Sequence, residues 1–167
     1  SGEEELVIGS PVAGRERVEL EGLIGFFANT VVMRTDVSGE PTVRELMKRV
    51  REECLGAYGH RELPFERLVE VLQPDRDLNY TPLFQIMFAL QDEPDVHSGH
   101  QWFGGLSLRR LHDLESTVTT KRDLTVYMIN QPEGMLGVFE YDTELFDQVT
   151  IARIGRHFQV LLEGMIA

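Results

Sequence analysis

A histidine and two glutamates lie close together in the stretch YGHRELPFE, residues 58–66, and could form an acid–base site. General acid–base catalysis needs a histidine whose proton affinity is tuned by a carboxylate within hydrogen-bond reach. The spacing does not force His60 against Glu62 or Glu66, because His60 is predicted to end one helix and Glu66 to lie inside the next. We therefore expect His60 to cap a helix C-terminus, where a protonated imidazole meets the negative end of the helix dipole.

Other residue patterns that could do chemistry are incomplete. HSGH, residues 97–100, has the H-x-x-H spacing of a metal pair, but no third ligand is nearby in the sequence, so we predict no metal site. Ser10 lacks the G-x-S-x-G turn that exposes a nucleophilic serine. The phosphate-binding loops G-x-x-x-x-G-K-S/T and G-x-G-x-x-G are also missing. The residues alone predict a domain with no self-contained catalytic site and no directly bound cofactor.

The composition is that of a soluble globular domain, with 42% hydrophobic and 26% charged residues. A length of 167 residues suffices for one domain or for one lobe of a larger domain. The net charge of -12 repels phosphate backbones and anionic lipids, so we expect neither a nucleic-acid nor a membrane partner. Cys54 is the only cysteine and is expected to be a small buried hydrophobe. Without an internal disulfide, the chain fits a reducing cytoplasm.

Runs of apolar, β-branched and aromatic residues between turn signals predict the strands. The run PLFQIMFAL is apolar at nearly every position, which is typical of a strand buried on both faces in the middle of a sheet. The long loop predicted for residues 92–105 follows it. The predicted strands are residues 6–14, 29–37, 82–90, 106–112, 123–130 and 135–142, and the last two form a hairpin.

Capping signals and helical periodicity predict three helices between these strands. Thr42 and Glu45 form a T-x-x-E capping box that opens an amphipathic helix ending near Gly59. Pro64 suits the first turn of a second, short helix, and Asp147 can cap a helix that runs to the end of the chain. Strands that alternate with helices predict an α/β layer with a mixed sheet.

Three stretches of the chain, in this order and spacing, resemble motifs of the condensation domains of nonribosomal peptide synthetases. IGFFANT, residues 24–30, resembles I-G-x-F-x-N-T; HRELPFE, residues 60–66, resembles H-Q-D-x-P-F-E; and RDLNYTPLFQ, residues 76–85, resembles R-D-x-S-x-x-P-L-F-Q. The flanking segments are similar as well, so the resemblance covers the chain. The departures are modest, and one is Arg122, which stands where an aromatic residue is usual.

The resemblance implies an α/β fold, one lobe of the chloramphenicol-acetyltransferase-like condensation fold, with a mixed sheet packed with helices. It maps residues 1–167 onto the C-terminal lobe, without the N-terminal lobe. In this family an H-H-x-x-x-D-G motif of the N-terminal lobe supplies the histidine that assists amide formation, and no His-His pair occurs in the chain. The chain is therefore expected to be inactive alone, as part of a domain that joins substrates tethered by phosphopantetheine to carrier domains.

The resemblance also implies roles for particular residues. Gly9, Ser10, Gly14 and Asn29 are expected beside the tunnel that admits two phosphopantetheine arms, one wall of which this lobe would form. Two alternatives stay open: Asn29 could tie neighbouring segments through its amide, and Ser10 could cap a turn. The residues of the similar motifs that are expected to be structural are Arg15, His60, Pro64, Phe65, Arg76, Asp77 and Asp123, with the arginines paired to Asp77 or Asp123.

The same resemblance implies the partners: the N-terminal lobe of the same domain, peptidyl carrier domains and an adjacent adenylation domain. Two other functions fit the same lobe. It could be a non-catalytic module that docks carrier domains, or the corresponding lobe of an epimerisation or ester-forming relative. An intact H-H-x-x-x-D-G upstream would favour the enzyme, and its loss would favour the module.

Overall fold

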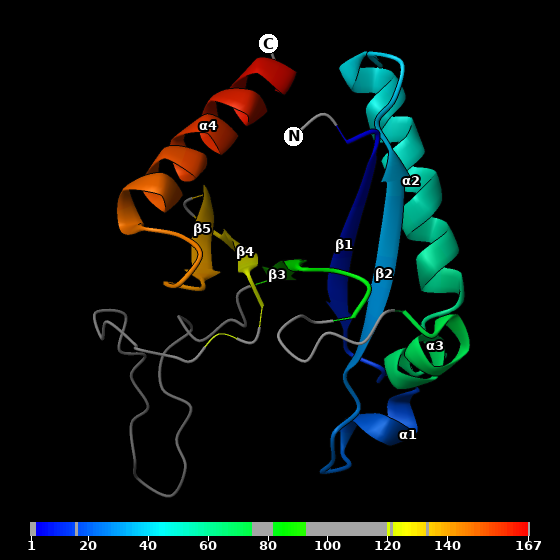
Figure 1. Cartoon of the computed structure of the whole chain (residues 1–167). Helices are drawn as coiled ribbons and strands as arrows, with labels where there is room; N and C mark the ends of the chain where they lie inside the picture. Colours follow the sequence, from blue (N-terminus) through cyan, green and yellow to red (C-terminus); the bar gives the residue numbers. More distant parts are fainter. Residues whose placement is uncertain are drawn as a thin grey trace, which may run out of the picture.

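The computed structural model describes residues 3–15, 17–74, 82–92, 120, 122–132 and 134–166. Within them, helices and strands are interspersed along the chain, with α2 followed directly by α3 and with β3, β4 and β5 in succession (Figure 1). The elements are β1 (Glu5–Val12), α1 (Val18–Glu21), β2 (Asn29–Asp36), α2 (Val43–Gly59), α3 (Phe65–Leu72), β3 (Ile86–Asp92), β4 (Leu124–Gln131), β5 (Gly134–Tyr141) and α4 (Gln148–Ile166).

The strands form a mixed sheet in the order β2-β1-β3-β4-β5. β1 pairs with β2 and β4 with β5 in antiparallel fashion, whereas β3 runs parallel to both β1 and β4. The predicted α/β class, mixed sheet and β4–β5 hairpin are therefore confirmed. β3 is the central strand, as its apolar sequence predicts.

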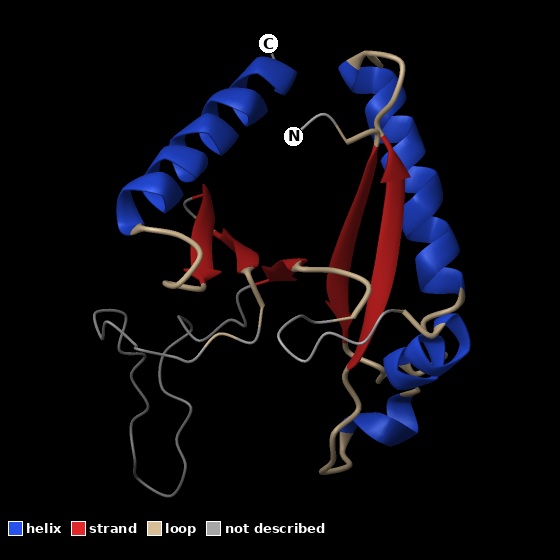
Figure 2. Cartoon of the chain, viewed as in Figure 1, coloured by secondary structure: helices blue, strands red, loops and turns tan. Residues whose placement is uncertain are grey.

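The two long helices pack near opposite edges of the sheet, α2 against β2 and α4 against β5 (Figures 1 and 2). The Cys54 thiol of α2 lies 3.5 Å from the Met33 sulfur of β2, and the rings of Phe139 and Phe158 meet edge to face at 6.5 Å. Cys54 is half-buried rather than fully buried as predicted. Burial raises the pKa of its thiol, and the nearby Glu53 carboxylate adds to that effect.

The predicted helix starts are confirmed by their capping contacts. The Thr42 hydroxyl accepts a hydrogen bond from the Glu45 N–H, and Glu45 in turn accepts from the Thr42 N–H at 2.9 Å. At the start of α4, Asp147 Oδ1 accepts from the Thr150 N–H at 2.6 Å. Each contact satisfies an N–H that has no partner within its helix.

The prediction that the central strand is buried on both faces is wrong for the described structure. Met87 and Ala89 are buried, but Ile86 is 42% and Leu90 64% exposed on the alternate face. The pairing register puts Ile86 and Leu90 on the same face as Met33, against which α2 packs. Because α2 covers this face near β2 and α4 covers it near β5, the centre between them is open.

Some predicted features fall outside the described residues: residues 93–105 of the long loop predicted for 92–105, the edge strand at 106–112 and the histidine pair of HSGH. Asp92 itself is the last residue of β3. In the part of the chain that the structure describes, no group of three or more His, Cys, Asp or Glu side chains could hold a metal ion. No helix in that part is long and apolar enough to cross a membrane.

The Asp147 cap makes the stability of α4 depend on pH. Its hydrogen bonds with the Thr150 backbone N–H and side chain hold the pKa of the Asp147 carboxyl below its ordinary value of 3.8. The stabilisation is present above that ordinary value and is lost as the pH falls through the lower folded-state pKa.

We expect Asp147→Ala to lower the free energy of unfolding at neutral pH. The difference in unfolding free energy between the parent protein and this variant should shrink as the pH falls from about 5 to about 2. Denaturant unfolding at a series of pH values measures it. Asp147→Ser is the control, because a hydroxyl cap carries no titrating charge. If the parent protein and Asp147→Ala differed in unfolding free energy by the same amount at every pH, the charged cap would be contradicted.

Candidate functional site

The buried ring of Phe84 is the point where separate segments of the chain meet. Phe84 is the one fully buried large side chain among the described residues, and it lies just before β3. The Phe65 ring, from the first turn of α3, meets it edge to face at 5.6 Å between centroids. The Arg122 guanidinium lies over its face at 5.3 Å, a cation–π arrangement. Phe84 thus joins α3 to the residues that lead into β3 and β4.

Gly9 of β1 makes room for this ring. A side chain at position 9 would place its Cβ 2.3 Å from Cε2 of Phe84, far inside van der Waals contact. Leu83, the residue before Phe84, has a φ of 73°, a strained conformation for a non-glycine residue. Packing against Phe84 therefore explains the glycine at position 9, where the sequence suggested approach of a substrate arm.

Asn29 holds the α2–α3 connection through three hydrogen bonds of its side-chain amide. Its Nδ2 donates to the carbonyls of Arg61 (2.8 Å) and Leu63 (2.7 Å), and its Oδ1 accepts from the Phe65 N–H (3.1 Å). Pro64, at the N-cap of α3, supplies no side-chain cap, so Asn29 satisfies one of the free N–H groups of that helix from β2. These contacts agree with the alternative in which Asn29 ties neighbouring segments together.

Arg15 holds the segment in and after α1 through its guanidinium. The guanidinium donates to four backbone carbonyls rather than to Asp123, and its Cζ lies 4.4 Å above the centre of the Phe27 ring. The acceptors lie in and after α1: Leu20 (2.7 Å), Glu21 (3.2 Å), Leu23 (2.7 Å) and Gly25 (3.3 Å). Asp77, the other expected partner, lies outside the described residues, as does Arg76.

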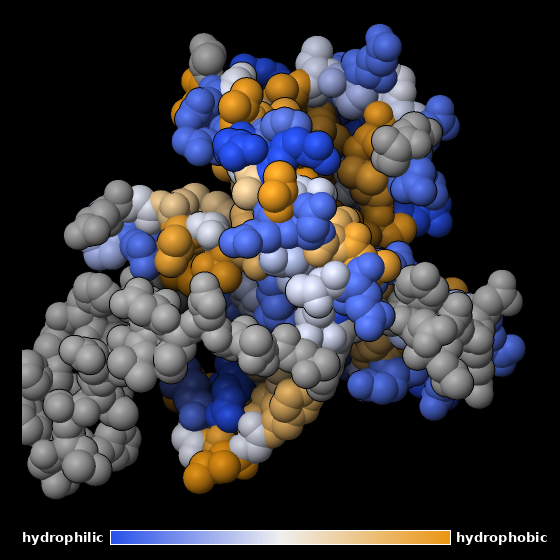
Figure 3. All heavy atoms as spheres, turned by 60° about the vertical axis from the view of Figure 1, so that its left-hand side comes forward, coloured by the Kyte–Doolittle hydropathy of each residue, from blue (hydrophilic) through white to orange (hydrophobic). Residues whose placement is uncertain are grey.

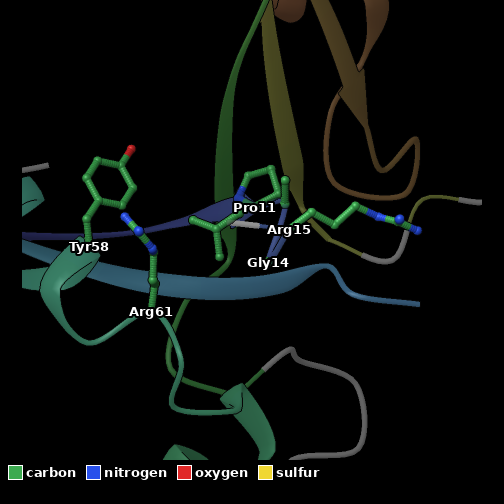
Figure 4. Close-up of a pocket in the computed structure, with 7 residues that line it drawn as sticks. Pro11, Gly14, Arg15, Tyr58 and Arg61 are labelled. Atoms are coloured by element: carbon green, nitrogen blue, oxygen red, sulfur yellow. The ribbon is translucent and has the colours of Figure 1, made fainter. Parts of the chain in front are cut away.

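In the part of the chain that the structure describes, two open hollows flank this junction. The larger has a volume of ≈ 1020 Å³, and charged side chains of both signs line it alongside phenylalanines. Its lining residues include Gly14, Asn29 and Phe65 and the charged residues Arg17, Arg61, Glu62, Glu66 and Arg122. The smaller, of ≈ 390 Å³, lies between the end of β1 and the end of α2 (Figure 4). There the Arg15 side chain extends away from Tyr58 and Arg61. Gly14 borders both hollows.

His60 does not form the acid–base site that its neighbours suggested. It is the C-cap residue of α2, and its backbone N–H donates to the Ala57 carbonyl at 3.1 Å. Among the described residues no hydrogen bond or ion pair joins His60 to Glu62 or Glu66. The two glutamates line the larger hollow, and His60 is not among the residues that line it. The helix-end position predicted for His60 is confirmed.

The other predicted residues are distributed around the junction. Ser10 is buried within β1, where it pairs with Val31, so it does not cap a turn. Asp123 precedes β4, and its carbonyl accepts a hydrogen bond from the Asp142 N–H at 3.0 Å.

The contact between Arg122 and Phe84 was not predicted. Its only sequence signal is the arginine at a position where the similar family usually has an aromatic residue. The Arg122 Nε is buried without a hydrogen-bond partner among the described residues, which carries a desolvation cost.

Comparison with known proteins matches the whole chain, residues 1–167, to the Condensation domain family. The chain is 49% identical over 167 residues to a linear gramicidin synthase of Brevibacillus parabrevis. It is 41% identical over 166 residues to a phosphinothricin tripeptide synthetase of Streptomyces viridochromogenes. The alignments cover 100% and 99% of this chain, but only 2% and 14% of those relatives.

Solved structures agree with the predicted fold. A four-domain nonribosomal peptide synthetase bound to AMP and glycine aligns with 99% of this chain and 13% of its own, with a TM-score of 0.78 and 26% identity. The X-domain from teicoplanin biosynthesis, in complex with OxyB, aligns with 92% of this chain and 33% of its own, with a TM-score of 0.77 and 27% identity. The mixed sheet with helices is that of the chloramphenicol-acetyltransferase-like condensation fold.

Replacing Gly9 should test the packing around Phe84. Gly9→Ala forces a methyl group into the space of a fully buried ring, and we expect a loss of about 1–3 kcal/mol of unfolding free energy. The matched control is Gly56→Ala in α2, where a Cβ meets open space and a gain of up to about 1 kcal/mol is expected. Denaturant unfolding measures both variants, and equal effects would contradict the proposed contact.

Removing the Asn29 amide should destabilise the protein rather than alter one step of a reaction. Asn29→Ala leaves two carbonyls and one N–H without their partner, so we expect a loss of about 2 kcal/mol or more in unfolding free energy. Gln159→Ala is the control, because this exposed amide of α4 bonds only to the Glu163 side chain in the described structure. Unchanged stability of Asn29→Ala, with slower turnover of the intact domain, would instead assign Asn29 to substrate contact.

Proposed function

The chain belongs to the condensation domain family, and we propose that residues 1–167 are the C-terminal lobe of such a domain in a nonribosomal peptide synthetase. The whole domain would form the amide bond between a carrier-bound aminoacyl or peptidyl thioester donor and a carrier-bound aminoacyl acceptor. The observation that carries the proposal is the junction at Phe84. The segments that resemble family motifs, far apart in sequence, meet there through Asn29, Phe65 and Phe84 beside one hollow.

We propose that the larger hollow is part of one wall of the substrate tunnel. Gly14 and Asn29 line it, and Gly9 and Ser10 lie nearby in β1. Amide formation requires the acceptor amine to be held deprotonated against the thioester carbonyl, a task of positioning as much as of base strength. In this proposal the chain contributes shape and polar contacts to phosphopantetheine-tethered substrates. The N-terminal lobe contributes the H-H-x-x-x-D-G histidine, and no residue of this chain is catalytic.

Exposed apolar side chains support a permanent partner for this lobe. Ile86 and Leu90 lie open at the centre of the sheet between α2 and α4, where a separate soluble domain would bury them. We propose that the rest of the same condensation domain, including its N-terminal lobe, is that partner. Carrier domains and an adjacent adenylation domain complete the proposed assembly.

A second function is favoured by one comparison. The X-domain from teicoplanin biosynthesis has the same fold and is found in complex with OxyB, so a domain of this fold can act as a binding partner. We therefore keep the non-catalytic docking module as the alternative. A third candidate function is that of the corresponding lobe in an epimerisation or ester-forming relative with the same fold.

The proposal predicts that the intact domain transfers an aminoacyl group between loaded carriers and that residues 1–167 alone do not. Mass spectrometry of the acceptor carrier measures the dipeptide, and replacement of the second His of the upstream H-H-x-x-x-D-G by Ala is the control that should remove it. Transfer by residues 1–167 alone would overturn the division between the lobes. Binding of both carriers without any product would favour the docking module, and an inverted or ester product would favour the relatives.

A further inference from the structure

A short uncharged loop, residues 22–28 with the sequence GLIGFFA, projects its apolar side chains into solvent between α1 and β2. Ile24 is fully exposed and Phe26 is 92% exposed, and Leu23 is also exposed. In Figure 1 the loop lies at the lower end of the molecule, beside α1 and opposite both termini, and apolar side chains gather at that end in Figure 3. Isolated exposed apolar residues are common, but several side by side on one projection indicate an interaction surface.

The loop is held in one conformation by Arg15. The guanidinium donates to the carbonyls of Leu23 and Gly25 within the loop and stacks over the Phe27 ring. Gly14 lies directly beneath: its φ is 62°, and a Cβ there would fall 2.0 Å from the Phe27 carbonyl oxygen, so only glycine fits. The exposed side chains are therefore presented on a preorganised backbone, which lowers the entropy lost when a partner binds.

The composition of the loop indicates a permanent partner rather than a transient one. In a chain of which 26% is charged, residues 22–28 carry no charge. Permanent interfaces are more apolar than transient ones, and charged residues are depleted at their cores. Carrier domains, which must arrive and leave in each cycle, are a poor match for a surface of this kind.

We propose that the loop of residues 22–28 inserts into an apolar groove of the remaining part of the same condensation domain, with Ile24 and Phe26 as its anchors. This inference rests on the proposed function. The coverage of a solved structure supports the proposal: the chain spans only 33% of the X-domain chain that shares its fold, so the rest of the same domain can supply the neighbouring surface. Phe26 also lines the larger hollow, so docking of the loop closes one side of that hollow.

Photo-cross-linking in the intact domain, together with its carrier domains, tests the occupant. Phe26 is replaced by p-benzoylphenylalanine, and the cross-linked peptides are identified by mass spectrometry. We expect cross-links to a segment of the same condensation domain that lies outside residues 1–167. Cross-links to a carrier domain, to the adenylation domain or to a second copy overturn the proposal, as does their absence. The same amino acid at Lys48, an exposed charged position of α2, is the control and should give no such cross-link.

A second measurement does not depend on the cross-linker. Ile24→Ser with Phe26→Ser should lower the thermal transition of the intact domain by several degrees, because the anchors leave a buried interface. Val71→Ser, at an exposed apolar position of α3, is the matched control and should have little effect. Equal effects of the two variants overturn the proposal.

The transfer assay on the unmodified domain separates this inference from the proposed function. Transfer with cross-links elsewhere defeats the docking site alone. Cross-links to the same domain without transfer leave the docking site standing and defeat the proposed reaction.

Discussion

The packing of Phe84 is the constraint on which the arrangement of this chain depends. This one buried ring packs against Gly9 of β1, where no side chain fits, and it contacts the Phe65 ring of α3 and the Arg122 guanidinium before β4. Interiors pack at the density of organic crystals, so a ring shared by several elements fixes their relative positions more tightly than scattered contacts would. The strained φ of Leu83 is tolerated because the surrounding packing determines where Phe84 must lie.

The polar side chains of Asn29 and Arg15, near the junction, make hydrogen bonds to backbone groups. Asn29 satisfies two carbonyls and one N–H of the α2–α3 connection, and Arg15 satisfies four carbonyls in and after α1. Irregular connections carry backbone groups that no helix or strand pairs, and a buried group left unpaired is costly. Side chains that supply these bonds hold the connections rigid, and the hollows form between them.

The described residues leave many apolar side chains exposed, and two such places bear on the proposed function. The centre of the sheet is uncovered between α2 and α4, and the loop of residues 22–28 projects Ile24 and Phe26 into solvent. Both features fit the proposal that the chain is part of a larger domain. A division of labour follows in the proposed function: this lobe provides a shaped wall, and the attacking and activating groups are brought to it by other parts of the synthetase.

The sequence by itself determined the local elements, because their signals are local. The capping box at Thr42 and the cap at Asp147 are contacts within a few residues, and the strand at residues 29–36 is signalled by a local run of β-branched residues. Its resemblance to a family also indicated the fold. Only the tertiary structure decided that Gly9 accommodates a ring, that Arg15 binds carbonyls instead of Asp123, and that one face of β3 is open. Those outcomes depend on residues far apart in the chain, which packing brings together and which no local pattern encodes.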